Sequence, residues 1–166
     1  SKLDINRIYS INETYIKTID EKDLFNFFKE YVSKYKKPID QAKESVLLKS
    51  MSFLKNKAKT LEDIWSNAQY IINDKIEVGA DDKKLIDDLS KKVINDFINE
   101  FEKLSSPSRE TLEPVIKSLI DKHKTNFKGV GQPLRISLVG SRFGPGLYDV
   151  ILSLDKAEVI KRLKSV

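Results

Sequence analysis

The residues whose types and spacing could do chemistry lie near the C-terminus and suit binding rather than catalysis. Arg135 carries a planar guanidinium that can stack on a nucleobase or donate two hydrogen bonds to a phosphate, and Arg142 follows one short turn later. Pro145 is rigid and apolar, the glycines beside it allow close backbone approach, and Leu147 can complete an apolar shelf. These features predict recognition of unstacked bases. The alternative is a plain loop between helices, with Arg135 in an ion pair.

Composition leaves little that could catalyse a reaction. The 166 residues include no Cys and one His, His123, which excludes disulfides, thiolate metal sites and any site that needs two imidazoles. We expect His123 to be structural, because it ends a helix where an imidazolium complements the helix dipole. The six glycines form no strand, turn and helix unit that could cradle a nucleotide phosphate. The sequence therefore predicts a binding module with no catalytic residue and no metal site.

Positive charge is concentrated in the last third of the chain. The net charge of +5 resides entirely in residues 109–166, which hold 11 basic and 6 acidic residues. Residues 34–59 are also basic, with 8 basic and 2 acidic residues, whereas residues 62–104 hold 6 basic and 11 acidic residues. Basic surfaces attract phosphates, although a Lys-rich stretch is also typical of a solvated helix face. No apolar run reaches membrane-spanning length and no signal peptide opens the chain, so we expect a cytoplasmic protein.

Apolar residues recur at helical spacing almost throughout, which predicts an all-α fold. We expect two small helical subdomains, residues 1–75 and 76–166, with a loop from Ile76 to Asp82 between them. The spacing predicts helices that begin after the capping residues Asp4, Asp20, Thr60, Ser108 and Asp155, with Asp63 completing a capping box at Thr60 and Glu158 one at Asp155. It also predicts a helix from near Asp40 to Ala58, and single helices over 60–72 and 83–104, the last with Leu89 on its apolar face. Leu134, Ile136 and Leu138 fit a strand or a helix, and the pattern leaves both open.

The C-terminal segment resembles the end of bacterial glutamyl-tRNA synthetases in order and spacing. The matching residues are Gln132-Pro133-Leu134-Arg135, then Gly140, then Gly144-Pro145-Gly146-Leu147, then Lys156, Glu158, Arg162 and Leu163. Two further stretches are similar to the same family: Lys57-Ala58-Lys59-Thr60-Leu61, at a junction between helices, and Leu3 to Lys17, after the catalytic half. We therefore identify the chain as similar to the anticodon-binding region of that family.

This resemblance implies a helical arm that binds tRNA for a class I, ATP-dependent glutamate-tRNA ligase. The chain has neither of the family's two catalytic motifs, so the resemblance implies an inactive fragment, with ATP and magnesium bound only by the full enzyme. It implies a monomer that binds glutamate tRNA, and binding of glutamine tRNA stays open. The implied anticodon-binding residues are Arg135, Arg142, Gly144, Pro145, Leu147, Lys57 and Lys59.

One departure from the family bears on specificity, and one other class of function stays open. Gly144 stands where stricter members of the family have Thr, so the turn lacks a hydroxyl and we expect permissive anticodon reading. The alternative function is a helical protein-protein interaction module, in which the acidic stretch from Glu62 to Leu104 docks a basic partner.

Overall fold

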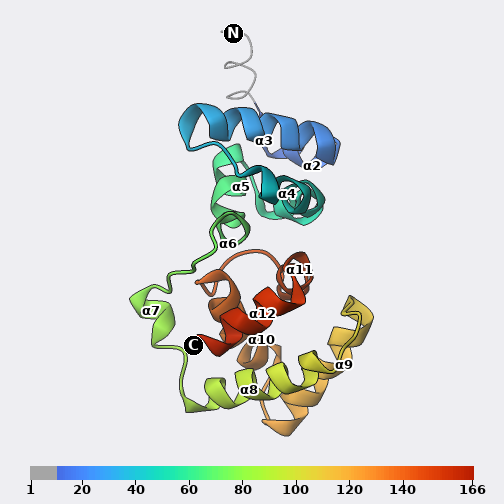
Figure 1. The fold of residues 1–166 in the computed structure, drawn as a ribbon, viewed down its shortest axis with the longest axis vertical. Helices are drawn as coiled ribbons and strands as arrows, with labels where there is room; N and C mark the ends of the chain where they lie inside the picture. Colours follow the sequence, from blue (N-terminus) through green and yellow to red (C-terminus); the bar gives the residue numbers. More distant parts are fainter. Residues whose placement is uncertain (1–10) are drawn as a thin grey trace. The chain divides into compact units, whose positions relative to one another are not determined.

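The computed structural model describes residues 11–166, and the regular structure in this range is entirely helical (Figure 1). The expected all-α fold is therefore confirmed. The chain divides into two compact units, Ser1–Asp74 and Lys75–Val166, which we call the N-terminal and C-terminal units. The helix start expected after Asp4 lies outside the described residues. No helix in the described range is long and apolar enough to cross a membrane.

The N-terminal unit is built from helices. Its elements are α2 (Glu13–Thr18), α3 (Glu21–Tyr35), α4 (Gln41–Leu54), the 3-10 helix η1 (Lys55–Lys57), α5 (Leu61–Asn67) and α6 (Gln69–Ile72). The N-cap side chains of α2, α3, α4 and α5 each accept a hydrogen bond from a backbone amide. The expected capping box at α5 is confirmed, because the Asp63 amide donates to Thr60 Oγ1 (3.1 Å) and the Thr60 amide donates to Asp63 Oδ2 (3.2 Å). The core consists of buried apolar side chains from α2 to α6: Ile16, Leu24, Phe28, Val32, Leu47, Met51, Leu54, Ile64 and Ile71.

The single helix expected over 60–72 is wrong, since the chain forms α5 and α6 with a break at Ala68. The backbone of Ala68 (φ −92°, ψ −1°) lies at the edge of the right-handed helical region, and Ala68 itself is buried. Tyr70 and Ile71 are both buried beyond the break. Apolar residues continue at helical spacing through this point, so the pattern alone does not reveal the change of direction.

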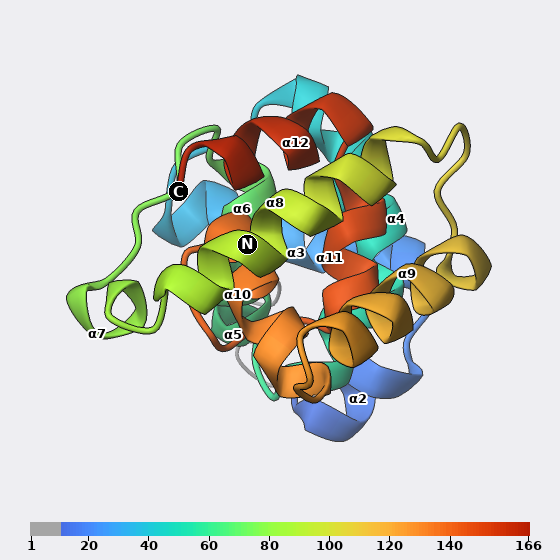
Figure 2. The same ribbon diagram turned by 90° about the horizontal axis from the view of Figure 1, so that it is seen from below.

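In the C-terminal unit, one helix is surrounded by the others. The elements are α7 (Ala80–Lys83), α8 (Asp88–Glu102), α9 (Arg109–Lys122), α10 (Phe127–Val139), α11 (Leu147–Ser153) and α12 (Lys156–Lys164). Helix α10 packs against α8, α9, α11 and α12 (Figure 2). Leu134 and Leu138 lie on one side of α10 and Ile136 on the opposite side, and all three are fully buried. A helix that is buried on opposite sides carries apolar residues on both, which explains why its pattern imitates a strand.

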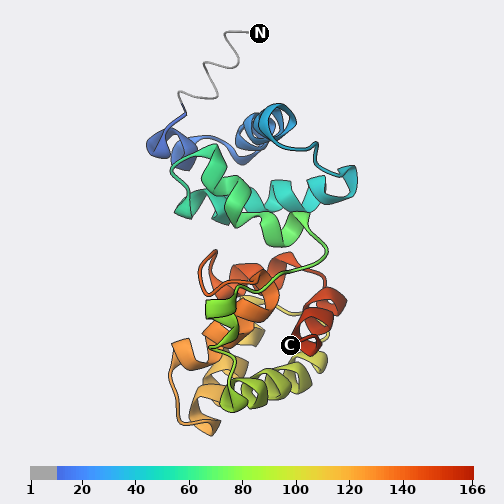
Figure 3. The same ribbon diagram turned by 90° about the vertical axis from the view of Figure 1, so that its left-hand side faces the viewer.

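The segment that leads into α8 differs from the expected one. The extended stretch after α6 runs into the short helix α7, which begins inside the expected loop (Figure 3). Helix α8 starts only at Asp88, because Asp87 acts as its N-cap and accepts a hydrogen bond from the Ser90 amide (2.8 Å). The expected helix over 83–104 is thus too long at its start. Leu89, expected on the apolar face, is 47% exposed.

His123 has a structural role, as the sequence indicates. It is the C-cap of α9, its ring is largely buried, and its Nε2 lies 2.8 Å from Asp96 Oδ2 on α8. Lys122 Nζ lies 2.9 Å from the same oxygen. Hydrogen bonds from Lys122 and His123 hold the pKa of Asp96 below its usual range. This cluster therefore ties the end of α9 to α8.

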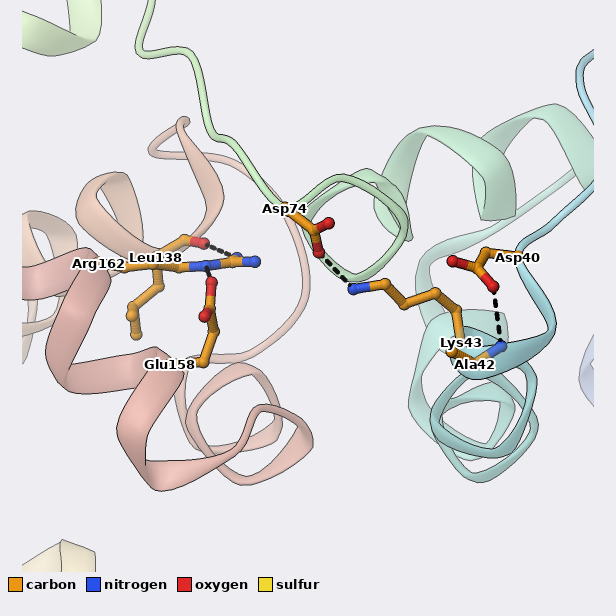
Figure 4. A network of polar contacts seen from close by, with 7 residues as sticks. All are labelled: Asp40, Ala42, Lys43, Asp74, Leu138, Glu158 and Arg162. Atoms are coloured by element: carbon orange, nitrogen blue, oxygen red, sulfur yellow. Dashed lines mark hydrogen bonds and ion pairs between the residues drawn. The ribbon is translucent and has the colours of Figure 1, made fainter.

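The last helix connects to α10 through a buried arginine. Arg162 is 6% exposed, and it donates from Nη1 to the Leu138 carbonyl (2.8 Å) and from Nε to Glu158 Oε1 (2.9 Å; Figure 4). Asp155 is at the N-cap position of α12, but the expected capping box is wrong because Glu158 pairs with Arg162 instead. Figure 4 also shows the ion pair between Lys43 and Asp74 (2.7 Å), which lies within the N-terminal unit.

Candidate nucleic-acid interface

The turn after α10 begins at a glycine that no other residue can replace without strain. Gly140 ends α10 in the left-handed region (φ 89°), and its amide donates to the Ile136 carbonyl (2.8 Å). A Cβ at this position would lie 2.6 Å from Ile76 Cγ2 and 2.7 Å from the Glu77 carbonyl oxygen. The turn therefore packs directly against the segment that precedes α7.

Hydrogen bonds fix the rest of this turn, residues 140–146, from two sides. The Arg142 amide donates to Asp82 Oδ1 of α7 (3.4 Å), and Arg142 Nε lies 3.3 Å from the same oxygen. From α10, Arg135 Nη1 donates to the Arg142 carbonyl (3.3 Å). The structure thus brings Arg135 and Arg142 together, as the sequence predicts. Arg135 Nη1 and Arg142 Nε also hold the turn in place. The sequence does not reveal this structural role.

Arg135 has a hydrogen-bond donor left after its contact with the Arg142 carbonyl. It is half-buried, and burial lowers the pKa of its guanidinium, although an arginine stays protonated at any physiological pH. Its Nε is buried, and no acceptor within residues 11–166 takes its hydrogen. A buried donor without a partner favours binding of an acceptor from another molecule.

A cavity of about 600 Å³ opens beside the two arginines. Its walls come from α10, from the turn and from the segment before α8, and they comprise Leu85, Phe127, Lys128, Gly131, Gln132, Arg135, Arg142 and Phe143. The polar groups on these walls are mostly hydrogen-bond donors. The cavity therefore suits a ligand that has acceptor atoms and an apolar face.

The apolar shelf expected of Pro145 and Leu147 is wrong, because both side chains are buried and Leu147 is only 2% exposed. They support the turn from its inner side. Gly144 has φ 142°, where a side chain is strained, although the nearest atom to a Cβ there is Val139 Cγ1 at 3.6 Å. Gly144→Thr would therefore change the backbone as well as add a hydroxyl, and permissive reading by Gly144 stays a prediction.

Lys57 and Lys59 lie in the N-terminal unit, around the junction between η1 and α5. Both are exposed, and the Lys59 amide donates to Asp63 Oδ2 (2.9 Å), so the helix cap fixes the backbone of the junction. Lys55 differs, since its Nζ lies 3.0 Å from Glu21 Oε1 and donates to the Ile19 carbonyl (3.2 Å). Lys57 and Lys59 are thus exposed at the surface of the unit, and Lys55 helps to hold the unit together.

Comparison with protein families decides what kind of domain this is. The family described as "Anticodon binding domain" matches residues 17–166, which is most of the chain. The chain belongs to the anticodon-binding domain family. The resemblance found in the sequence is thereby confirmed.

Individual relatives agree with this family. Glutamate-tRNA ligase from Pelagibacter ubique is 53% identical over 163 residues, which cover 98% of this chain and 35% of that protein. The enzyme of the same name from Nitrobacter hamburgensis is 28% identical over 170 residues, or 98% of this chain and 36% of that protein. The chain thus spans about a third of the length of these curated relatives.

Solved structures share the fold of this anticodon-binding domain. A crystal structure of a glutamate tRNA ligase from Elizabethkingia meningosepticum, in complex with its amino acid, superimposes with a TM-score of 0.75. The identity is 21%, and the match covers 93% of this chain and 30% of that chain. At this identity the likeness establishes the helical fold and nothing further.

Two aromatic residues of the anticodon-binding domain were missed by the sequence reasoning. Phe143 in the turn is 71% exposed and Phe127 at the start of α10 is 45% exposed, and both line the cavity. The signal for Phe143 is its place between an arginine and a glycine in a glycine-rich turn. Phe127 has no comparable signal in the sequence.

Proposed function

We propose that the chain is the anticodon-binding part of a glutamate-tRNA ligase and that it acts by binding tRNA as a monomer. The observation that carries this proposal is the family match over residues 17–166, together with the 53% identical glutamate-tRNA ligase. In this proposal the attachment of glutamate, which uses ATP and magnesium, takes place in another part of the enzyme. Residues 11–166 contain no group of three or more His, Cys, Asp or Glu that could hold a metal ion.

The C-terminal unit has the physical properties that a reader of unstacked bases needs. Its turn is fixed by Gly140 and by the contact between Arg142 and Asp82, so little conformational freedom would be lost on binding. Arg135 adds a planar cation that has an unused donor. A preorganised, basic, donor-rich cavity supports contact with RNA.

The competing function, a protein-protein interaction module, depends on the acidic stretch from Glu62 to Leu104. Several of its carboxylates already have partners within their own unit. Glu62 pairs with Lys36 (3.0 Å), Asp82 with Arg142 and Asp96 with His123. These carboxylates stabilise the units, which weakens the case for a basic protein partner.

Titration of labelled tRNA at several salt concentrations tests the proposal. We expect saturable binding that weakens as salt rises, because phosphate contacts release counterions. Glutamate and glutamine tRNAs, compared in the same assay, test which of them the domain prefers. Absence of a salt-dependent shift with either tRNA would contradict the proposal and favour the protein-protein module.

Arg135→Ala is expected to weaken tRNA binding by about 1 to 3 kcal/mol, because it removes a cation and its unused donor from the cavity. Circular dichroism should show an unchanged helical content, since Arg135 is half-buried and accounts for only one bond to the turn. Lys164→Ala is the control, as it removes the same charge from an exposed position on α12. An unchanged affinity together with a lower melting temperature would make Arg135 a purely structural residue.

Neutralising Lys57 and Lys59 together is expected to reduce the dependence of affinity on salt. Each lost phosphate contact lowers the slope of log affinity against log salt by up to about 1. The matched control is Lys17→Gln with Lys22→Gln, which removes two charges from α2 and α3 of the same unit. Equal slopes for wild type and the Lys57 and Lys59 variant would show that these lysines are only solvated.

A further inference from the structure

Two exposed phenylalanines on the same cavity are the least explained feature of the C-terminal unit. Phe143 is 71% exposed and Phe127 is 45% exposed, yet both line the cavity beside Arg135. A phenyl ring in water gains free energy when a ligand covers it. The two rings therefore offer apolar surface to a ligand in the cavity.

Local contacts restrain both rings. Phe143 follows Arg142, whose guanidinium lies 5.2 Å from the centre of the ring, and its amide donates to Ser141 Oγ (3.0 Å). Phe127 lies in the first turn of α10 and packs on Gly131, where an added Cβ would be 3.3 Å from Phe127 Cε1. Its other neighbour is Tyr148, with ring centres 6.2 Å apart. The rings are therefore positioned before any ligand arrives.

The polar groups on the walls of the same cavity select for hydrogen-bond acceptors. Arg135 Nε is buried, and among the described residues nothing accepts its hydrogen. Gln132 adds an amide and Lys128 an ammonium to the same walls. A flat group with acceptor atoms on its edge would satisfy the donors and cover the rings at once, and a nucleobase has both properties.

We propose that Phe143 and Phe127 are the aromatic walls of a pocket for one unstacked nucleobase, with Phe143 stacked on its face and Arg135 and Gln132 at its edge. This inference rests on the proposed function, since it names how the RNA is held. The volume of about 600 Å³ is in the range of small-ligand pockets. Phe143 is thus assigned to binding, and the buried Pro145 and Leu147 to support of the turn.

Single substitution of loop bases by 2-aminopurine provides the test, because the fluorescence of this base falls when it stacks on an aromatic ring. Each anticodon-loop position of a tRNA transcript is replaced in turn and titrated with the protein. We expect quenching at one position with wild type and with Phe143→Trp, and loss of that quenching with Phe143→Ala. Affinity should fall by about 5- to 150-fold in Phe143→Ala, as for other base-stacking aromatic residues.

The controls separate this inference from the proposed function. Leu152→Ala removes an exposed apolar side chain of α11, which is not a wall of the cavity, and is expected to leave affinity and quenching unchanged. If wild type binds tRNA but Phe143→Ala retains both affinity and quenching, the base pocket is wrong and the proposed function stands. If wild type binds no tRNA, both are wrong.

Discussion

Gly140→Ala is expected to lower the free energy of unfolding of the C-terminal unit by about 2 to 5 kcal/mol. The left-handed backbone (φ 89°) costs an alanine about 1 to 2 kcal/mol. The new Cβ also overlaps Ile76 Cγ2 at 2.6 Å and the Glu77 carbonyl oxygen at 2.7 Å, and relief of such overpacking costs about 1 to 3 kcal/mol. A backbone oxygen moves less easily than the end of a side chain. Urea denaturation followed by circular dichroism measures the loss.

Gly79→Ala is the matched control for this substitution. Gly79 has φ −63°, and the nearest atom to an added Cβ is Asp82 Oδ2 at 3.9 Å, so an alanine fits without strain. It is expected to change stability by less than about 1 kcal/mol, with a small gain from the stiffer unfolded chain. Similar losses for the two variants would show that the position of Gly140 has no special constraint.

The helices and most of their caps could be predicted because they depend on neighbouring residues. Thr60 with Asp63 and Ser108 at the start of α9 satisfy amides two or three residues away, and these interactions are visible in the sequence. The late start of α8 also has a local cause, the N-cap Asp87, but apolar residues at helical spacing begin before it and conceal it. The break at Ala68 could not be predicted, because apolar spacing continues through it and burial, which depends on distant elements, decides the path of the chain.

The candidate site was only partly predictable for the same reason. The sequence indicated Arg135 and Arg142 as cations near a glycine-rich turn. Arg142 holds that turn through Asp82, which lies 60 residues before it in the chain, and Arg135 holds it through the Arg142 carbonyl. Leu147 was expected to complete an apolar shelf for a base, but it packs inside the unit. The exposed apolar surface belongs to Phe143, whose role becomes visible only once the cavity is known.

Arg162→Met is expected to destabilise the C-terminal unit by about 2 to 4 kcal/mol. The methionine retains much of the buried volume but leaves the Leu138 carbonyl without the hydrogen bond that Arg162 Nη1 donates. A buried acceptor without a partner costs about 1 to 3 kcal/mol, and Glu158 also loses its cation. Because Leu138 lies in the last turn of α10, the loss reaches the start of the 140–146 turn. Thermal and urea denaturation measure the effect, and tRNA affinity is expected to fall with it.

Two further variants show whether burial is the cause. Arg109 forms the same type of ion pair, four residues from Glu113, but its side chain is 63% exposed, so Arg109→Met should cost less than about 1 kcal/mol. Glu158→Gln retains the bond from Arg162 to Leu138 and should cost less than Arg162→Met. If burial of Arg162 is the cause, the loss in free energy of unfolding is largest for Arg162→Met, smaller for Glu158→Gln and smallest for Arg109→Met. If Arg162→Met costs no more than Arg109→Met, the connection between α12 and α10 does not depend on this side chain.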